Sequence, residues 1–130
     1  MFDSAGPRST ILIVEDEALL LMALIDELEA EGLSVLAVTN AEAALVILET
    51  RHSEIAILFT DVNLSGAMDG LSLARVVHSR WGHISLWVTS GRFAWNEDDL
   101  PFPGRFISKP YLFPELAADF CETLRGTPLS

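Results

Sequence analysis

Charged and hydroxyl side chains follow four short apolar segments of this sequence. Each segment ends at groups that can bind a cation or an anion, namely Glu15 and Asp16, Asp61, Thr89 and Ser90, and Lys109. Three carboxylates held close together repel one another, and a hard divalent cation such as Mg²⁺, which prefers oxygen ligands, relieves that repulsion. The residue types therefore predict a cation site, provided that the fold brings the four segment ends together.

The same groups suit phosphoryl chemistry. Asp61 is the expected nucleophile, because a carboxylate can attack phosphorus and form an acyl phosphate. Asp16 and Asp61 are the expected direct metal ligands, while Glu15, one methylene longer, is expected to act through a water. The backbone carbonyl of Asn63 is near enough in sequence to add another oxygen. Phosphoryl transfer mainly needs positioning and charge neutralisation, and the groups expected to supply them are the cation, Lys109, Thr89 and the loop amides after Asp61.

The apolar pattern predicts the elements that must position these groups. Short continuous apolar runs are typical of strands buried on both faces of a parallel sheet, and five occur, over 10–14, 34–38, 55–59, 84–88 and 105–108. Helical spacing predicts helices over 18–31, 41–50, 71–80 and about 114–125. A fourth helix within 92–104 is expected to be short, distorted or absent, because Pro101 and Pro103 lie there. Alternating strands and helices imply a doubly wound α/β sheet, whose ligands bind beyond the carboxyl ends of the strands.

Length and composition predict one acidic domain. The 130 residues suffice for a single domain, expected over 10–125 between a flexible tail at 1–9 and a second tail at 126–130. The formal net charge of −11 argues against nucleic acid or an anionic membrane as a partner. The N-terminus does not resemble a signal peptide, and the single cysteine, Cys121, permits no internal disulfide. A cytoplasmic protein is expected.

Four blocks of the sequence resemble the signature blocks of response-regulator receiver domains from bacterial two-component systems. They are ILIVEDE at 11–17, FTDVNL at 59–64 with MDG at 68–70, VTSG at 88–91, and FISKP at 106–110. The likeness covers about residues 10–125, and the chain is identified as a stand-alone, single-domain member of the family. It implies a flavodoxin-like (CheY-like) five-stranded parallel sheet with strand order 2-1-3-4-5.

The resemblance also implies a mechanism and partners. A histidine kinase or phosphotransfer protein would phosphorylate Asp61, with Mg²⁺, or Mn²⁺ in its place, held by Glu15, Asp16, Asp61 and the Asn63 carbonyl. The implied phosphoryl-binding and switch residues are Thr89, Ser90, Lys109 and the aromatic Phe106. The protein would be regulatory, would catalyse only its own phosphorylation and dephosphorylation, and would signal to an unknown downstream protein. It would act as a monomer or as a phosphorylation-dependent dimer.

The sequence departs from the family pattern in four places. The acidic pair is Glu15 and Asp16 rather than two Asp, a common variant that is expected to preserve metal binding. Ser65 stands where the family usually has proline, and the loop to Gly70 is one residue longer, with Ala67 as the apparent insertion. The interval from Thr89 to Lys109 is short, so the family's usual dimer face is in doubt.

Two groups of apolar residues are candidate partner surfaces. Leu19, Met22 and Ala23 fall away from the apolar face of the first predicted helix; they are either scattered exposed side chains or a docking surface for the kinase's helical bundle. Three aromatics of the proline-containing segment, Phe93, Trp95 and Phe102, either pack under a loop or form a second partner patch.

Two other functions remain as alternatives. One is a receiver-like interaction module that is not phosphorylated, which the intact set of Asp16, Asp61, Thr89 and Lys109 disfavours. The other is a Mg²⁺-dependent phosphatase with an aspartyl nucleophile. Such enzymes commonly place a second Asp two residues after the nucleophile, where this sequence has Asn63.

Overall fold

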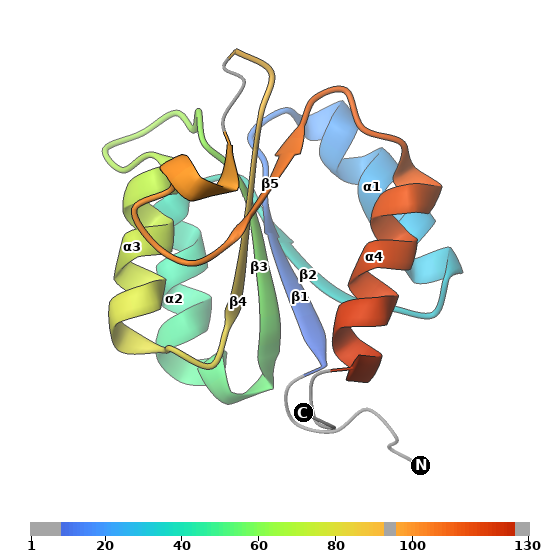
Figure 1. The fold of residues 1–130 in the computed structure, drawn as a ribbon, viewed down its shortest axis with the longest axis horizontal. Coiled ribbons are helices and arrows are strands. Elements are labelled where there is room, and N and C mark those ends of the chain that lie inside the picture. The colour runs from blue at the N-terminus through green and yellow to red at the C-terminus, as the bar shows by residue number, and fades with distance from the viewer. Residues whose placement is uncertain (1–8, 93–95, 127–130) are drawn as a thin grey trace.

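A computed structural model of the chain describes residues 9–92 and 96–126, and its elements alternate between strands and helices (Figure 1). In chain order they are β1 (Thr10–Val14), α1 (Ala18–Ala30), β2 (Ser34–Val38), α2 (Ala41–Arg51), the 3₁₀ turn η1 (His52–Glu54), β3 (Ile55–Asp61), α3 (Gly70–Arg80), β4 (Ser85–Ser90), the 3₁₀ turn η2 (Glu97–Asp99), β5 (Arg105–Ser108) and α4 (Phe113–Gly126). The tails predicted at 1–9 and 126–130 lie almost wholly outside the described residues, so that division of the chain stays a prediction.

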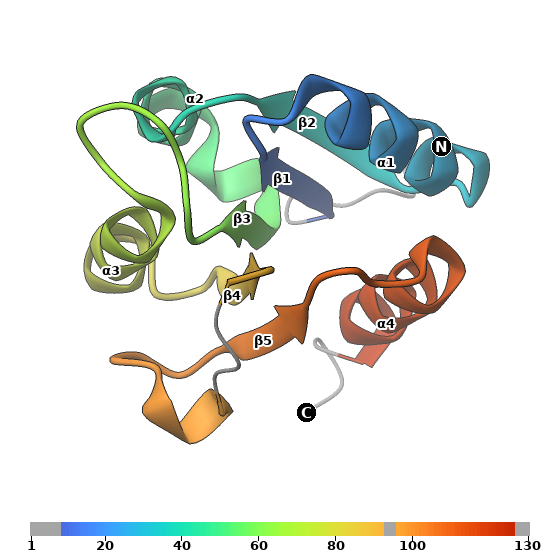
Figure 2. The same ribbon diagram turned by 90° about the horizontal axis from the view of Figure 1, so that it is seen from above.

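The five strands form one parallel sheet in the order β2-β1-β3-β4-β5, which confirms the predicted fold. Helices α1 and α4 cover one face of the sheet, and α2 and α3 cover the other (Figure 2). Because all strands run the same way, their carboxyl ends share one edge. The strand order reverses between β1 and β3, and ligands of such sheets bind at this kind of position.

The strands are buried on both faces because successive side chains point to opposite sides. In β1, Leu12 and Val14 join the core under α2 and α3, whereas Ile11 and Ile13 join the core under α1 and α4. All four side chains are almost completely buried. This two-sided burial explains why the apolar runs in the sequence are continuous rather than alternating.

The segment between β4 and β5 holds no regular α-helix in its described part, as the prolines predicted. The turn η2 replaces it, and Glu97 in that turn accepts a hydrogen bond from the Phe106 backbone N–H at 3.2 Å and pairs with Arg105 at 3.3 Å. Phe102 is buried in the core under α2 and α3. Phe93 and Trp95 lie outside the described residues, so their role as a partner patch stays a prediction.

Within 9–92 and 96–126, the helices are too short or too polar for any of them to cross a lipid bilayer.

Candidate functional site at the carboxyl edge of the sheet

Backbone hydrogen bonds fix the positions of the predicted site residues at the carboxyl edge. Asp61 and Thr89 are paired directly across β3 and β4. Glu15 extends the line of β1, since its N–H donates to the Val38 carbonyl at 3.1 Å. Lys109 follows β5, and its N–H donates to the Ser90 carbonyl at 3.0 Å. Four separate segments of the chain thus reach the same edge.

The three predicted acidic residues lie together. Glu15, Asp16 and Asp61 each offer a carboxylate oxygen, and these oxygens all lie within 4.8 Å of one another. Glu15 and Asp61 are buried, whereas Asp16 is exposed. Mg²⁺ binds oxygens at about 2.0–2.1 Å, so two ligands on opposite sides of it are about 4 Å apart. The donor set therefore fits a small oxygen-preferring cation after a modest contraction.

Lys109 bridges two of the carboxylates. Its Nζ atom lies 2.7 Å from Asp61 Oδ2 and 2.9 Å from Glu15 Oε1. Burial raises the pKa of Glu15 above its usual value, against the opposing effects of Lys109 and of the Glu17 N–H. Burial also lowers the pKa of Lys109, but its hydrogen bonds to Asp61 and Glu15 outweigh this, so the net shift is upward. The ammonium group therefore stays charged beside the acids.

Hydroxyl groups of β4 complete the edge, and they differ in their bonding. The Thr89 Oγ1 atom is buried and has no hydrogen-bond partner among the described residues. Ser90 Oγ accepts hydrogen bonds from Asn63 Nδ2 at 3.3 Å and from the Arg92 N–H at 3.1 Å. Ser90 thus supports the surrounding loops, whereas Thr89 holds a hydroxyl with no acceptor, and a buried unsatisfied donor is costly unless something uses it.

The loop after Asp61 folds back over the site. The Asn63 N–H donates to Asp61 Oδ1 at 2.9 Å, which orients the carboxylate. Phe106, the predicted switch aromatic, lies in β5 beside Val88; it is half-buried and packs against the core under α2 and α3.

Comparison with known proteins decides the family. The family model of the response regulator receiver domain matches residues 11–99. The chain is a response-regulator receiver domain. Among curated proteins, the two-component response regulator PhoP of Pseudomonas aeruginosa is 33% identical over 124 residues, which cover 88% of this chain and 51% of PhoP. The heme response regulator HssR of Staphylococcus epidermidis is 32% identical over 108 residues, covering 81% of this chain and 46% of HssR.

Solved receiver structures share the fold. A receiver domain protein from Clostridium thermocellum superimposes with a TM-score of 0.80 at 19% identity, over 93% of this chain and 98% of that chain. The receiver domain of the hybrid histidine kinase CckA gives 0.76 at 29% identity, over 88% and 98% of the two chains. Because the receiver spans about half the length of the curated relatives it matches, the prediction that it stands alone stays a prediction.

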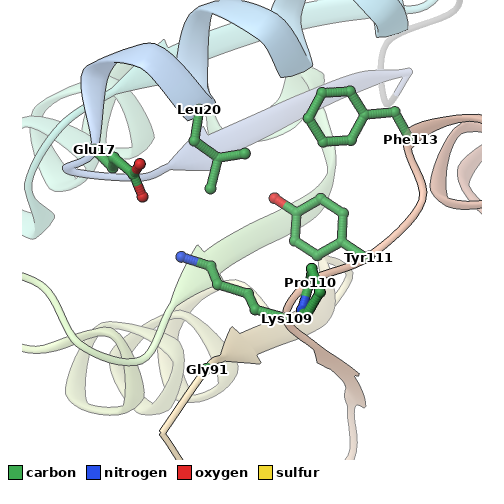
Figure 3. A pocket seen from close by; sticks show the side chains of 7 residues that line it. All are labelled: Glu17, Leu20, Gly91, Lys109, Pro110, Tyr111 and Phe113. Carbon is green, nitrogen blue, oxygen red and sulfur yellow. The ribbon is translucent and has the colours of Figure 1, made fainter.

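A pocket beside Lys109 opens at the same edge of the receiver (Figure 3). It has a volume of about 530 Å³ and is lined by Glu17, Leu20, Gly91, Lys109, Pro110, Tyr111 and Phe113. The hydroxyl of Tyr111 points toward Leu20 (Figure 3). It is buried and has no hydrogen-bond partner among the described residues. Burial, followed by the charges of Glu15 and Asp61, raises the pKa of Tyr111. Sequence reasoning missed this residue, because a single Tyr after Lys-Pro carries no signal of its own.

Gly70 is a second residue whose role the sequence did not reveal. A Cβ atom added to Gly70 would lie 1.8 Å from the Asp61 carbonyl oxygen. The first residue of α3 can therefore only be glycine if the backbone around Asp61 is to keep this position. The only signal in the sequence was the Asp69-Gly70 pair, and such a pair is also typical of an ordinary helix start.

The predicted partner surface on α1 is exposed. The exposed fractions of Leu19 and Met22 are 79% and 62%, and Ala23 is also exposed, whereas Leu21 and Leu24 on the opposite face are buried. What this surface binds stays a prediction.

Proposed function

We propose that this receiver is a phosphorylation switch in a two-component pathway, in which Asp61 accepts a phosphoryl group from the histidine of a kinase or phosphotransfer protein. The observation that carries the proposal is the bridge from Lys109 to Asp61 and Glu15, beside Asp16 and the unpartnered Thr89 hydroxyl. A charged lysine and three carboxylates at one strand edge have little structural value, because burying charges is costly. Their arrangement matches the needs of phosphoryl transfer.

The carboxylates of Glu15, Asp16 and Asp61, with the Asn63 carbonyl, would hold a Mg²⁺ ion or a Mn²⁺ ion in its place. When bound, the cation neutralises the crowded acids and charge on the phosphoryl oxygens. Asp16 and Asp61 would be the direct ligands, and Glu15, whose side chain is one methylene longer, would act through a water. Lys109 contacts one oxygen of both Glu15 and Asp61, at 2.9 Å and 2.7 Å, so it would share these two carboxylates with the cation.

In the transfer step, an Asp61 carboxylate oxygen forms a bond to phosphorus while the phosphorus–nitrogen bond of the donor phosphohistidine breaks. The imidazole leaves with the bonding electron pair and takes up a proton from solvent. Lys109 lies 2.7 Å from Asp61 Oδ2 and can contact a phosphoryl oxygen at that position. Thr89 can donate its free hydroxyl to another phosphoryl oxygen, and Phe106 then moves inward into the space that Thr89 leaves.

Partner binding would take place on two surfaces. The kinase would approach over the exposed Leu19, Met22 and Ala23 on α1. This surface follows Glu15 and Asp16 in the chain, and these two residues form the acidic edge together with Asp61. An unidentified downstream protein would recognise the phosphorylated state by protein–protein contact, and the protein would act in the cytoplasm. In the described part of the link between β4 and β5, the 3₁₀ turn η2 stands where the family commonly has a helix used for dimers, so the monomer is the expected unphosphorylated form.

The test is incubation with acetyl phosphate, with Mg²⁺ or with EDTA, followed by intact-mass measurement. The wild type is expected to gain one phosphoryl group only with Mg²⁺, and Asp61→Asn is expected to gain none. Asp98→Asn is the matched control, since Asp98 is an exposed acid in η2 and is not one of the three clustered acids. A wild type that stays unmodified would favour the interaction module, and steady hydrolysis of a small phosphate ester would favour a phosphatase.

A further inference from the structure

A backbone group of the β3–α3 loop contacts the most exposed of the three carboxylates. The N–H of Ser65 donates a hydrogen bond to Asp16 Oδ2 at 3.1 Å, across 49 positions of sequence. Ser65 departs from the proline that the resemblance to receiver domains implies at this position. Proline has no N–H, so a chain with proline there could not make this bond.

The loop is anchored on both sides of Ser65. Before it, the Asn63 N–H is bonded to Asp61 Oδ1. After it, the Gly70 N–H donates to the Val62 carbonyl at 2.9 Å, and Asp69 caps α3 by accepting from the Ser72 N–H at 2.8 Å. These bonds limit the freedom of the loop, so the Ser65 N–H is presented to Asp16 rather than meeting it by chance.

Asp16 needs such support more than its neighbours do. Lys109 holds both Glu15 and Asp61 at hydrogen-bond distance, and both side chains are buried. Asp16 is exposed, and within the described part of the chain its side chain makes no ion pair or hydrogen bond with Lys109. Hydrogen bonds to a metal ligand orient that ligand, and losing one typically weakens metal binding by about 10- to 100-fold.

We propose that Ser65 is a positioning residue for the divalent cation. Its N–H holds the Asp16 carboxylate in the orientation in which it can bind the cation together with Glu15 and Asp61. This inference rests on the metal site of the proposed function. The bond uses only Oδ2 of Asp16 and needs no serine hydroxyl. The side chain at position 65 is therefore free to vary, provided that the residue keeps its N–H.

The test compares Ser65→Pro, which removes the N–H, with Ser65→Ala, which keeps it. Gly66 has a φ of +106°, close to the third residue of a type II turn, and the second residue of such a turn accepts proline well, so Ser65→Pro is expected to fold. Mg²⁺ affinity is measured by calorimetric titration of the full chain without a phosphoryl donor. Ser65→Pro is expected to bind about 10- to 100-fold more weakly than wild type, and Ser65→Ala within about twofold of it.

A second measurement separates positioning from general damage to the loop. The unfolding temperature of the metal-free protein should be nearly the same in all three proteins, because an exposed hydrogen bond contributes little to stability. If Ser65→Pro does not fold, replacing Ser65 by its α-hydroxy acid exchanges the same N–H for an ester oxygen and keeps the side chain.

Four results are decisive. Equal Mg²⁺ affinities for Ser65→Pro and Ser65→Ala overturn this inference and leave the proposed function intact. So does a loss of affinity that is matched by a large fall in metal-free stability. A wild type that binds no Mg²⁺ overturns both this inference and the proposed metal site, whereas binding without phosphorylation of Asp61 overturns only the proposed function.

Discussion

Gly70→Ala tests the coupling between the start of α3 and Asp61, the proposed phosphoacceptor. The added Cβ would lie 1.8 Å from the Asp61 carbonyl oxygen and 2.7 Å from its carbon, and contacts under 3.0 Å essentially never occur. Backbone atoms cannot rotate away, so α3 or the Asp61 peptide must move by roughly 1 Å, a size of shift that overpacking produces. Such a shift strains the 2.9 Å bond from the Gly70 N–H to the Val62 carbonyl.

The expected cost combines overpacking, about 1–3 kcal/mol, with a weakened buried hydrogen bond, about 1 kcal/mol. A total of about 3 kcal/mol lowers the unfolding temperature of a domain of this size by about 10 °C. The displaced Asp61 should also accept a phosphoryl group about 100-fold more slowly, because a misplacement of about 1 Å typically has that effect.

The assays are thermal unfolding followed by circular dichroism, and the rate of phosphorylation by acetyl phosphate. Gly82→Ala is the matched control, since its added Cβ would meet its nearest atom, the His78 carbonyl oxygen, at 3.9 Å, an ordinary contact. If Gly70→Ala and Gly82→Ala unfold within about 2 °C of each other, the added Cβ does not strain the Asp61 backbone, because a difference that small is under about 1 kcal/mol.

Two further predictions concern the charges at the same edge. Tyr111 is the chain's single tyrosine, and its pKa is raised in the folded protein. Its contribution to stability is therefore present below the unfolded pKa of about 10 and is lost as pH rises through the higher folded pKa. Tyrosinate absorbance should therefore appear only as the protein unfolds, and Tyr111→Phe should lose less stability above pH of about 10; tyrosinate forming near pH 10 in the folded protein would contradict this. Lys109→Met leaves the buried Glu15 and Asp61 carboxylates without the lysine ammonium group. The metal-free protein should lose about 2 kcal/mol of stability, which is less than the ~3–5 kcal/mol for breaking a fully buried pair because Lys109 is partly exposed. Added Mg²⁺ should restore part of that loss in chemical denaturation, and an unchanged stability without Mg²⁺ would show that the bridge has no role in folding.

Most of the fold could be predicted because burial leaves a direct trace in the sequence. The runs at 10–14, 34–38 and 105–108 are strands with those limits. The apolar runs at 55–59 and 84–88 end two residues before β3 and β4 do, since these strands continue to Asp61 and Ser90. Apolar character reports which residues are buried in the core, whereas strand limits follow hydrogen bonds, and polar residues can make those equally well.

The candidate site could be predicted in its side chains but not in its supports. Acids, hydroxyls and an amine at strand ends are visible as residue types, and the parallel topology places those ends together. Three supports were not visible in this way. The Ser65 N–H and the closeness of Gly70 to Asp61 involve backbone atoms, which nearly every residue has. The Tyr111 hydroxyl is notable only because it has no hydrogen-bond partner among the described residues. No residue type marks such features, so only coordinates reveal them.

The charges at the acidic edge explain why phosphorylation and cation binding should reinforce each other. Glu15, Asp16 and Asp61 carry three negative charges when ionised, and Lys109 supplies one positive charge, so a divalent cation would balance the group. Burial raises the pKa of Glu15 above its usual value, and a bound cation would favour the ionised carboxylate, because metal ligands bind in their deprotonated form. An acyl phosphate on Asp61 replaces one carboxylate charge by about two phosphoryl charges, so the negative excess grows. Because coupling between two binding events is reciprocal, Mg²⁺ should favour phosphorylation of Asp61 to the same degree as phosphorylation strengthens Mg²⁺ binding.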